Sequence, residues 1–139
     1  ATVRRHDPMG PASSGETVVE AYASWGFTVS GVALEGAVLL LPKASFFFST
    51  PHIGLLTPDA LRVLELLDTP INMLVIGCGR QSQRVPADVH AWLDQRAVAV
   101  EALATAHACS TFNFMVQEQR SVAAVLFPLG SQDVNCNAS

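Results

Sequence analysis

Charged side chains are scarce in this sequence. They make up 14% of its 139 residues, whereas an ordinary soluble domain carries about 25%. Eight basic and twelve acidic residues give a formal net charge of −4, so the chain offers no basic surface to neutralise phosphates, and we expect no nucleic-acid partner. So few charges cover little surface. We therefore expect apolar surface to be buried against a partner protein or against a second copy of the chain.

Long apolar runs and cysteine pairs are also missing. No run approaches the roughly 18–20 apolar residues that a membrane-spanning helix needs, so we predict no transmembrane segment. The three cysteines, Cys78, Cys109 and Cys136, are widely spaced and contain no CxxC pair. This pattern predicts no disulfide framework and favours a reducing compartment.

The two ends of the chain differ in composition from its centre. Residues 1–16 begin with Ala rather than Met, contain Arg4, Arg5 and His6, and are poor in acids. This composition fits either the end of an organelle transit peptide or an ordinary flexible terminus. Residues 131–139 are polar and lack periodicity. We expect a flexible segment over 1–16, a single domain over 17–130 and a polar tail over 131–139.

The first third of the domain is predicted to be rich in β-structure. Phe27–Val29 and Val38–Leu41 have strand patterns, and the Glu35-Gly36 turn between them suggests an antiparallel hairpin. Phe46, Phe47 and Phe48 predict a third strand. Because side chains alternate across a strand, Phe46 and Phe48 should point to one face and Phe47 to the other.

The rest of the domain alternates helices and strands. Thr57-Pro58-Asp59 provides a hydroxyl cap, a first-turn proline and an acid, which predicts a helix running to about Asp68. The further predicted elements are a strand over 71–76, a helix after Pro86, a strand over 98–101, a helix over 105–118 and a strand over 122–127. Two right-handed crossovers should join the last three strands. The fold class is α/β, a single compact domain with a mixed central β-sheet and flanking helices.

The loop after the 71–76 strand is a candidate ligand site. Gly77, Cys78 and Gly79 follow the strand where a phosphate-binding loop would lie, and Arg80 and Arg84 could bind an anion. The dinucleotide fingerprint is incomplete, because Ser82 replaces its third glycine and no helix follows directly. A tight turn at a strand end explains the glycines equally well.

No residue pattern announces an enzyme. Cys78 is either an exposed thiol with a pKa lowered by Arg80 or a small, semi-buried side chain. His107 and Cys109, two apart on a helix, point in different directions, which is poor geometry for metal ligands. We find no pair of catalytic carboxylates, and we expect no cofactor and no metal.

The last predicted helix suggests a contact surface. His107 and Phe114 are seven residues apart and lie close together on the helical wheel, opposite its apolar face. A protein partner could contact them, although another part of the same chain could cover that face. Together with Phe46, Phe47 and Phe48, they are our candidate interface.

Four segments, read in order, carry a family resemblance. They are Leu74-Val75-Ile76-Gly77-Cys78-Gly79, Val98-Ala99-Val100-Glu101, Ala108-Cys109-Ser110-Thr111-Phe112-Asn113 and Gln119-Arg120-Ser121-Val122-Ala123-Ala124-Val125-Leu126-Phe127-Pro128. Together they resemble the small α/β family that includes the mitochondrial NADH dehydrogenase (complex I) assembly factor three. Ser110 stands where the family has Arg, and Phe48 lies near its usual Trp.

The resemblance implies a non-catalytic interaction protein of the mitochondrion. It would act on the matrix side, peripheral to the inner membrane, with subunits of the matrix arm of complex I as partners. Either a transient assembly factor or a retained accessory subunit fits the sequence, and a homodimer is compatible with it. The alternative is a small-molecule or anion-binding α/β domain, or a minor enzyme, that uses the Gly77–Arg84 loop.

Overall fold

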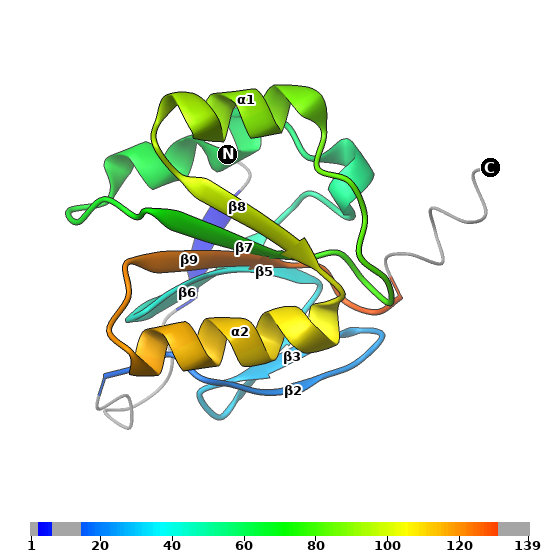
Figure 1. Ribbon diagram of the computed structural model, residues 1–139. Coiled ribbons are helices and arrows are strands. Elements are labelled where there is room, and N and C mark those ends of the chain that lie inside the picture. Colours follow the sequence, from blue (N-terminus) through cyan, green and yellow to red (C-terminus); the bar gives the residue numbers. More distant parts are fainter. Residues whose placement is uncertain (1–2, 7–14, 131–139) are drawn as a thin grey trace.

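The computed structural model describes residues 3–6 and 15–130. Its elements form three layers, with a six-stranded sheet in the middle (Figure 1). Two 3₁₀ helices, η1 (Ile53–Leu55) and η2 (Asp59–Leu66), and helix α1 (Ala87–Gln95) cover one face of this sheet. Helix α2 (Thr105–Gln117) and a three-stranded sheet cover the other face. The single α/β domain with a mixed central sheet is confirmed.

The small sheet changes the predicted pairing of the first third. Its strands are β2 (Val19–Tyr22), β3 (Gly26–Val29) and β4 (Val32–Glu35), in the order β2-β3-β4. Ser30 and Gly31 join β3 to β4 with positive φ angles of 49° and 85°, as a two-residue hairpin turn of the primed kind requires. The expected hairpin between Phe27–Val29 and Val38–Leu41 is therefore wrong, because β4 takes the place beside β3.

The large sheet has the strand order β1-β6-β5-β9-β7-β8. Its antiparallel half contains β1 (Val3–His6), β5 (Ala37–Leu41) and β6 (Ala44–Phe48), and β5 also pairs antiparallel with β9 (Val122–Leu126). Its parallel half contains β7 (Met73–Gly77), β8 (Ala99–Leu103) and β9, with β7 in the middle.

The order of the parallel strands explains why α1 and α2 lie on opposite faces. From β7 the chain steps outward to β8, and from β8 it steps back across β7 to β9. Right-handed crossovers that run in opposite directions place their helices on opposite faces of a sheet, and Figure 1 shows this arrangement. The buried side chains accordingly form two clusters, one under α1 and η2 and one under α2 and the small sheet.

Helix η2 begins where the sequence predicts but has 3₁₀ geometry and ends at Leu66 rather than Asp68. The Thr57 Oγ1 atom accepts a hydrogen bond from the Ala60 N–H at 3.3 Å. A 3₁₀ helix has three residues per turn, so the spacing of three in Asp59, Arg62 and Glu65 places these residues in one row. The same period stacks Leu61 and Leu64 on the sheet side, where Leu61 is fully buried.

One side chain of α2 forms hydrogen bonds with the small sheet, in addition to the apolar packing between them. The Asn113 Oδ1 atom accepts a hydrogen bond from the Val19 N–H, and the Asn113 Nδ2 atom donates to the Val19 carbonyl, both at 2.9 Å. An amide side chain thus completes the edge of β2 as a neighbouring strand would. Among residues 3–6 and 15–130, no helix has the length and apolar character needed to cross a bilayer.

Candidate functional site

The Gly77–Arg84 loop lies at the carboxyl ends of β7 and β8. The chain leaves these two neighbouring strands toward opposite faces of the sheet, and α/β proteins usually bind ligands in the crevice that such a switch creates. The sequence prediction therefore placed a candidate ligand site at the location that the fold class favours.

The chain itself fills this crevice. The Cys78 N–H donates to the Leu103 carbonyl at 2.8 Å, and the Gly79 N–H donates to the Thr105 Oγ1 atom at 2.8 Å. The buried Thr105 hydroxyl in turn donates to the Phe127 carbonyl at 2.6 Å. A side chain on Gly77 would stand 3.0 Å from both Leu126 and Thr105. The amides of Cys78 and Gly79 are thus already bound within the protein and cannot also cradle a phosphate.

The Cys78 thiol is buried in this arrangement. Its Sγ atom lies 3.9 Å from the Ile76 carbonyl oxygen and 3.8 Å from that of Gln83. Burial raises the pKa of this thiol, an effect that outweighs its backbone hydrogen bonds. Arg80 and Arg84 are exposed. Of the two interpretations of Cys78, the geometry supports the small buried side chain, since a reactive thiol needs access and a lowered pKa.

The phenylalanine strand is covered on both faces. Phe48 is buried beneath the helical layer, with its ring 6.3 Å from that of Phe127 in an edge-on arrangement. Phe46 is partly buried against the same cluster, and Phe47 is partly buried against the cluster on the opposite face. The expected alternation is confirmed. Phe48 contributes to the core, and the contact of Phe46 and Phe47 with a partner stays a prediction.

Helix α2 does present His107 and Phe114 to solvent. Both side chains are exposed, and Phe114 is 61% accessible. Their neighbours Ala108, Phe112 and Val116 are buried against the sheet. The described part of the chain therefore leaves this face uncovered, and its use as an interface stays a prediction.

A second region, not predicted from the sequence, is hollow. It lies at the amino ends of β7 and β9, beside the turn that joins β5 to β6. A hollow of about 480 Å³ opens there, and most of its lining is apolar. The lining residues are Leu41, Pro42, Lys43, Ala44, Leu67, Asp68, Thr69, Pro70, Ile71, Arg120, Ser121 and Val122.

Two further hollows adjoin the first one. A hollow of about 280 Å³ shares Leu67, Pro70 and Ile71 with it and extends to Trp92 and Val98. A third, of about 370 Å³, shares Glu65, Trp92 and Arg96 with the second and reaches Pro58, Asp59 and Arg62. We call the three hollows together the amino-end groove. It runs from the 41–44 turn, past residues 67–71, to the space between η2 and α1.

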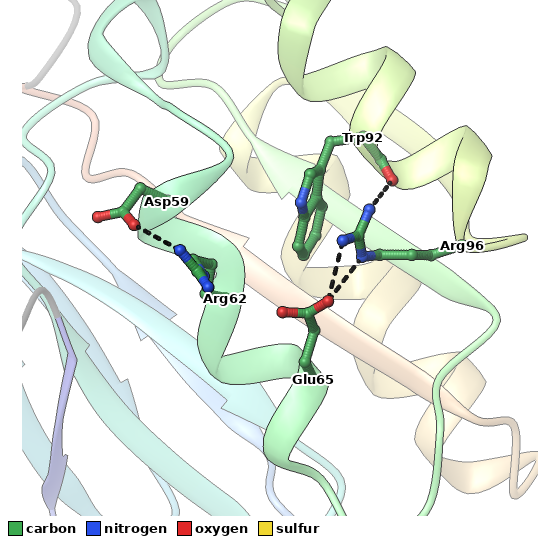
Figure 2. A network of polar contacts seen from close by, with 5 residues as sticks. All are labelled: Asp59, Arg62, Glu65, Trp92 and Arg96. Carbon is green, nitrogen blue, oxygen red and sulfur yellow. Dashed lines mark hydrogen bonds and ion pairs between the residues drawn. The ribbon is translucent and has the colours of Figure 1, made fainter.

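A polar network fixes the wall between the second and third hollows (Figure 2). The Arg96 guanidinium contacts one Glu65 oxygen through Nε at 3.0 Å and through Nη2 at 2.9 Å. Its Nη1 atom donates to the Trp92 carbonyl at 3.1 Å, and its Cζ atom lies 3.9 Å from the centre of the Trp92 ring. Arg96 therefore joins η2 to α1 and holds the Trp92 ring along the groove.

The charges of the groove are unevenly distributed. At its η2 end each arginine has an acidic partner, Arg96 with Glu65 and Arg62 with Asp59. At its 41–44 end, neither Lys43 nor Arg120 forms an ion pair within the described ranges, and Asp68 is the one acid in the lining. Leu66, at the end of η2, is 80% exposed. The groove thus combines an apolar floor with a positively charged end.

Sequence reasoning did not identify the residues of this groove. They come from four separate stretches of the chain, and no sequence motif joins these stretches. The sequence shows the spacing of three between Asp59, Arg62 and Glu65, but it does not show that Glu65 pairs with Arg96 at the end of α1. Across residues 3–6 and 15–130, no group of three or more His, Cys, Asp or Glu side chains is placed to hold a metal ion.

Solved structures share this fold. A crystal structure titled as an outer membrane protein from Bartonella henselae superposes with a TM-score of 0.74 at 29% identity, covering 82% of this chain and 96% of that one. An NMR structure of a Mth938-like domain from Bordetella pertussis gives a TM-score of 0.70 at 23% identity, covering 90% of this chain and 92% of that one. The architecture is thus that of the Mth938-like α/β domains.

Sequence comparison then gives the family. Residues 19–127, from β2 to the end of β9, match the model described as "Protein of unknown function (DUF498/DUF598)", and the chain belongs to this family. It is 34% identical over 110 residues to the Xenopus tropicalis protein named NADH dehydrogenase [ubiquinone] 1 alpha subcomplex assembly factor 3, covering 79% of this chain and 60% of the relative.

Two other relatives extend this comparison. The Danio rerio protein of the same name is 34% identical over 120 residues, covering 86% of this chain and 69% of the relative. An uncharacterized protein of Rhodobacter capsulatus is 26% identical over 122 residues, covering 88% and 93%. The resemblance inferred from the sequence is confirmed. The chain spans about 60% of the length of the frog relative.

Proposed function

We propose that this chain is a non-catalytic interaction protein that assists the assembly of mitochondrial complex I. The observation that carries the proposal is the 34% identity to the zebrafish assembly factor 3 over 69% of that protein's length. The aligned part covers 86% of this chain, which supports a common fold and a related role for the two proteins.

Two features of the structure support a role in binding rather than catalysis. The crevice where an α/β enzyme would hold its substrate is filled by Thr105 and by the backbone of Gly77–Gly79. The apolar groove at the other end of the strands is accessible instead. The amides of Cys78 and Gly79 are bound within the chain, so the geometry does not favour the anion-binding alternative.

The proposal includes a place and a set of partners. The protein acts in mitochondria, on the matrix side and peripheral to the inner membrane, and it binds subunits of the matrix arm of complex I. A low content of charge, 14% of residues, fits a protein that buries part of its surface against others. Transient assembly and permanent attachment differ only in whether the mature complex keeps the chain.

Native separation of gently solubilised organelle membranes, with mass spectrometry of each fraction, tests the proposal. We expect the chain to migrate with partial assemblies of complex I and to be absent from the mature complex. Presence in the mature complex would make it an accessory subunit. Migration near the mass of one or two copies, with no complex I subunit present, would overturn the proposal.

Complementation provides a second, independent measurement. Human cells that lack assembly factor 3 would receive this chain behind a mitochondrial leader, with the human protein as the positive control and the leader alone as the negative one. We expect complex I activity in native gels to rise above the negative control. The level of imported chain, measured by immunoblotting, separates a loss of function from a loss of protein.

A further inference from the structure

We propose that the amino-end groove binds an apolar segment of a partner protein, and that this segment places a carboxylate against Lys43 and Arg120. The inference rests on the proposed function, because it names the surface through which an assembly factor would hold a subunit or another factor.

The shape of the groove favours a chain segment over a compact small molecule. Its three hollows adjoin one another through shared lining residues, first Leu67, Pro70 and Ile71, and then Glu65, Trp92 and Arg96. Together they follow η2 from its last turn to Pro58 at its start. An extended or helical segment can occupy successive hollows with successive side chains, as grooves that bind peptides do.

The surface chemistry of the groove favours an apolar segment. Leucine, isoleucine, proline and alanine side chains dominate the largest hollow. Leu66 precedes the lining residue Leu67 in the chain and has 80% of its surface exposed. Contact with apolar side chains of a partner would remove these groups from water.

The charges determine which end of the segment is acidic. At the η2 end, Asp59 and Glu65 already neutralise Arg62 and Arg96. At the 41–44 end, Lys43 and Arg120 have no ion-pair partner among the described residues and are opposed by Asp68 alone. The whole chain carries a net charge of −4, so this positive end is local. It complements an aspartate, a glutamate or a carboxyl terminus.

The wall of the groove is organised before any partner binds. Arg96 links Glu65 on η2 to the Trp92 carbonyl on α1 and lies against the Trp92 ring, as Figure 2 shows. A fixed aromatic wall lowers the entropy that binding must overcome. The tryptophan thereby provides an anchor of the type that is enriched at the centres of protein interfaces.

Site-specific photo-cross-linking in organelles tests the inference directly. The full chain would carry p-benzoyl-phenylalanine in place of Leu66, and a matched chain would carry it in place of Phe114 on the opposite face. We expect an adduct from position 66 whose partner peptide contains apolar residues next to an aspartate, a glutamate or a carboxyl terminus.

Charge reversals then test the predicted orientation. Lys43→Glu and Arg120→Glu should each lower the yield of the adduct at position 66 by about fivefold or more, as expected for reversal of a complementary rim charge. Arg84→Glu, an equal change at an exposed arginine outside the groove, should alter the yield less than about twofold. Lys43→Gln and Arg120→Gln provide milder variants, and thermal unfolding of each confirms that it folds.

Three outcomes would overturn the inference: an adduct with a second copy of this chain, an adduct that the reversals leave unchanged, or an adduct formed from position 114 alone. Its failure is distinguishable from failure of the proposed function. If the chain still migrates with complex I assemblies while the reversals have no effect, the groove is wrong and the function stands. If the reversals act but the partner does not belong to complex I assembly, the groove stands and the function is wrong.

Discussion

The two ends of the parallel strands differ in how the chain occupies them. At the carboxyl ends of β7 and β8, the Cys78 N–H donates to the Leu103 carbonyl and the Gly79 N–H donates to the Thr105 hydroxyl. The Thr105 hydroxyl donates to the Phe127 carbonyl, and the Thr105 N–H donates to the Gly79 carbonyl. At the amino ends, a hollow of about 480 Å³ remains between the strands, the β5–β6 turn and residues 67–71. A fold class indicates where ligands usually bind, but the hydrogen bonds of the particular chain decide whether that place is available.

The largest expected effect is the difference in thiol reactivity between the folded and the unfolded chain. Burial raises the pKa of Cys78, and it raises the pKa of Cys109 to about 12. In a Cys136→Ser variant, a disulfide reagent at pH 8 should modify both thiols at least about a thousandfold more slowly than in the unfolded chain, because reaction requires opening of the core. Modification of the folded protein at the rate of a free thiol would show that the carboxyl end is not closed.

The raised thiol pKa also sets the sign of a pH effect. A folded-state pKa above the unfolded value of about 8.5 means that the unfolded chain loses its proton first. The contribution of Cys109 to stability is then complete below about pH 8.5 and declines as the pH rises toward about 12. The free energy of unfolding, measured by urea titration at pH 7.5 and 10, should fall over this interval in wild type by more than in Cys109→Ala.

The second largest effect concerns Thr105, which is completely buried. Thr105→Val keeps the volume but leaves the Gly79 N–H and the Phe127 carbonyl without their partner, and we expect a loss of about 3 kcal/mol in unfolding free energy. Thr105→Ser keeps the hydroxyl and should lose less. Chemical denaturation of both variants measures the difference, and equal losses would mean that packing rather than hydrogen bonding closes this end.

A smaller effect should follow from loosening the groove wall. Arg96→Ala removes the contacts with Glu65 and the Trp92 ring, and because this side chain is 35% exposed, we expect a loss of about 1 kcal/mol. Arg62→Ala is the control, since its ion pair spans 3.6 Å and its side chain is 68% exposed. Thermal unfolding should rank the two variants in this order. The opposite order would place the anchor of η2 elsewhere.

The smallest effect should be a gain in unfolding free energy from a substitution near the amino end of β8. Ala97 precedes β8 with a φ of 58°, a conformation that glycine adopts more easily. Ala97→Gly should therefore raise the unfolding free energy by about 0.5 kcal/mol. Ala91→Gly, inside α1, should lower it by about 1 kcal/mol. Denaturant titration of the pair separates backbone strain from a general effect of glycine.

The parts of the fold that depend on local signals could be predicted from the sequence. The start of η2 follows from Thr57-Pro58-Asp59, and the alternation of Phe46, Phe47 and Phe48 follows from strand geometry. Strands β2 and β4 were missed for a physical reason. Each buries a single side chain, Val19 in one and Leu34 in the other, so neither contains an apolar run.

The two candidate sites were harder to predict, for two different reasons. The Gly77–Arg84 loop has the composition of a ligand site. Its Gly79 amide, however, is hydrogen-bonded to Thr105, which in turn bonds to Phe127, and only the folded chain brings these residues together. The groove has no sequence signature, because the residues that line one hollow, Lys43 and Arg120 among them, lie far apart in the chain. Helical periodicity placed His107 and Phe114 opposite the apolar face of their helix but left open whether the chain covers them, and both are exposed.

The bond between Asn113 and Val19 has a consequence for how the protein acquires its structure. It links residues 94 positions apart. Strand β5 likewise pairs with β9, which lies far along the chain. During synthesis the amino-terminal third therefore emerges without the helix and the strand that will cover it. Phe27, Leu34 and Leu39 stay exposed until the last quarter of the chain is made, and contacts of such long range slow folding. The amino-terminal part of this domain is therefore the part whose apolar side chains wait longest for their packing partners during synthesis.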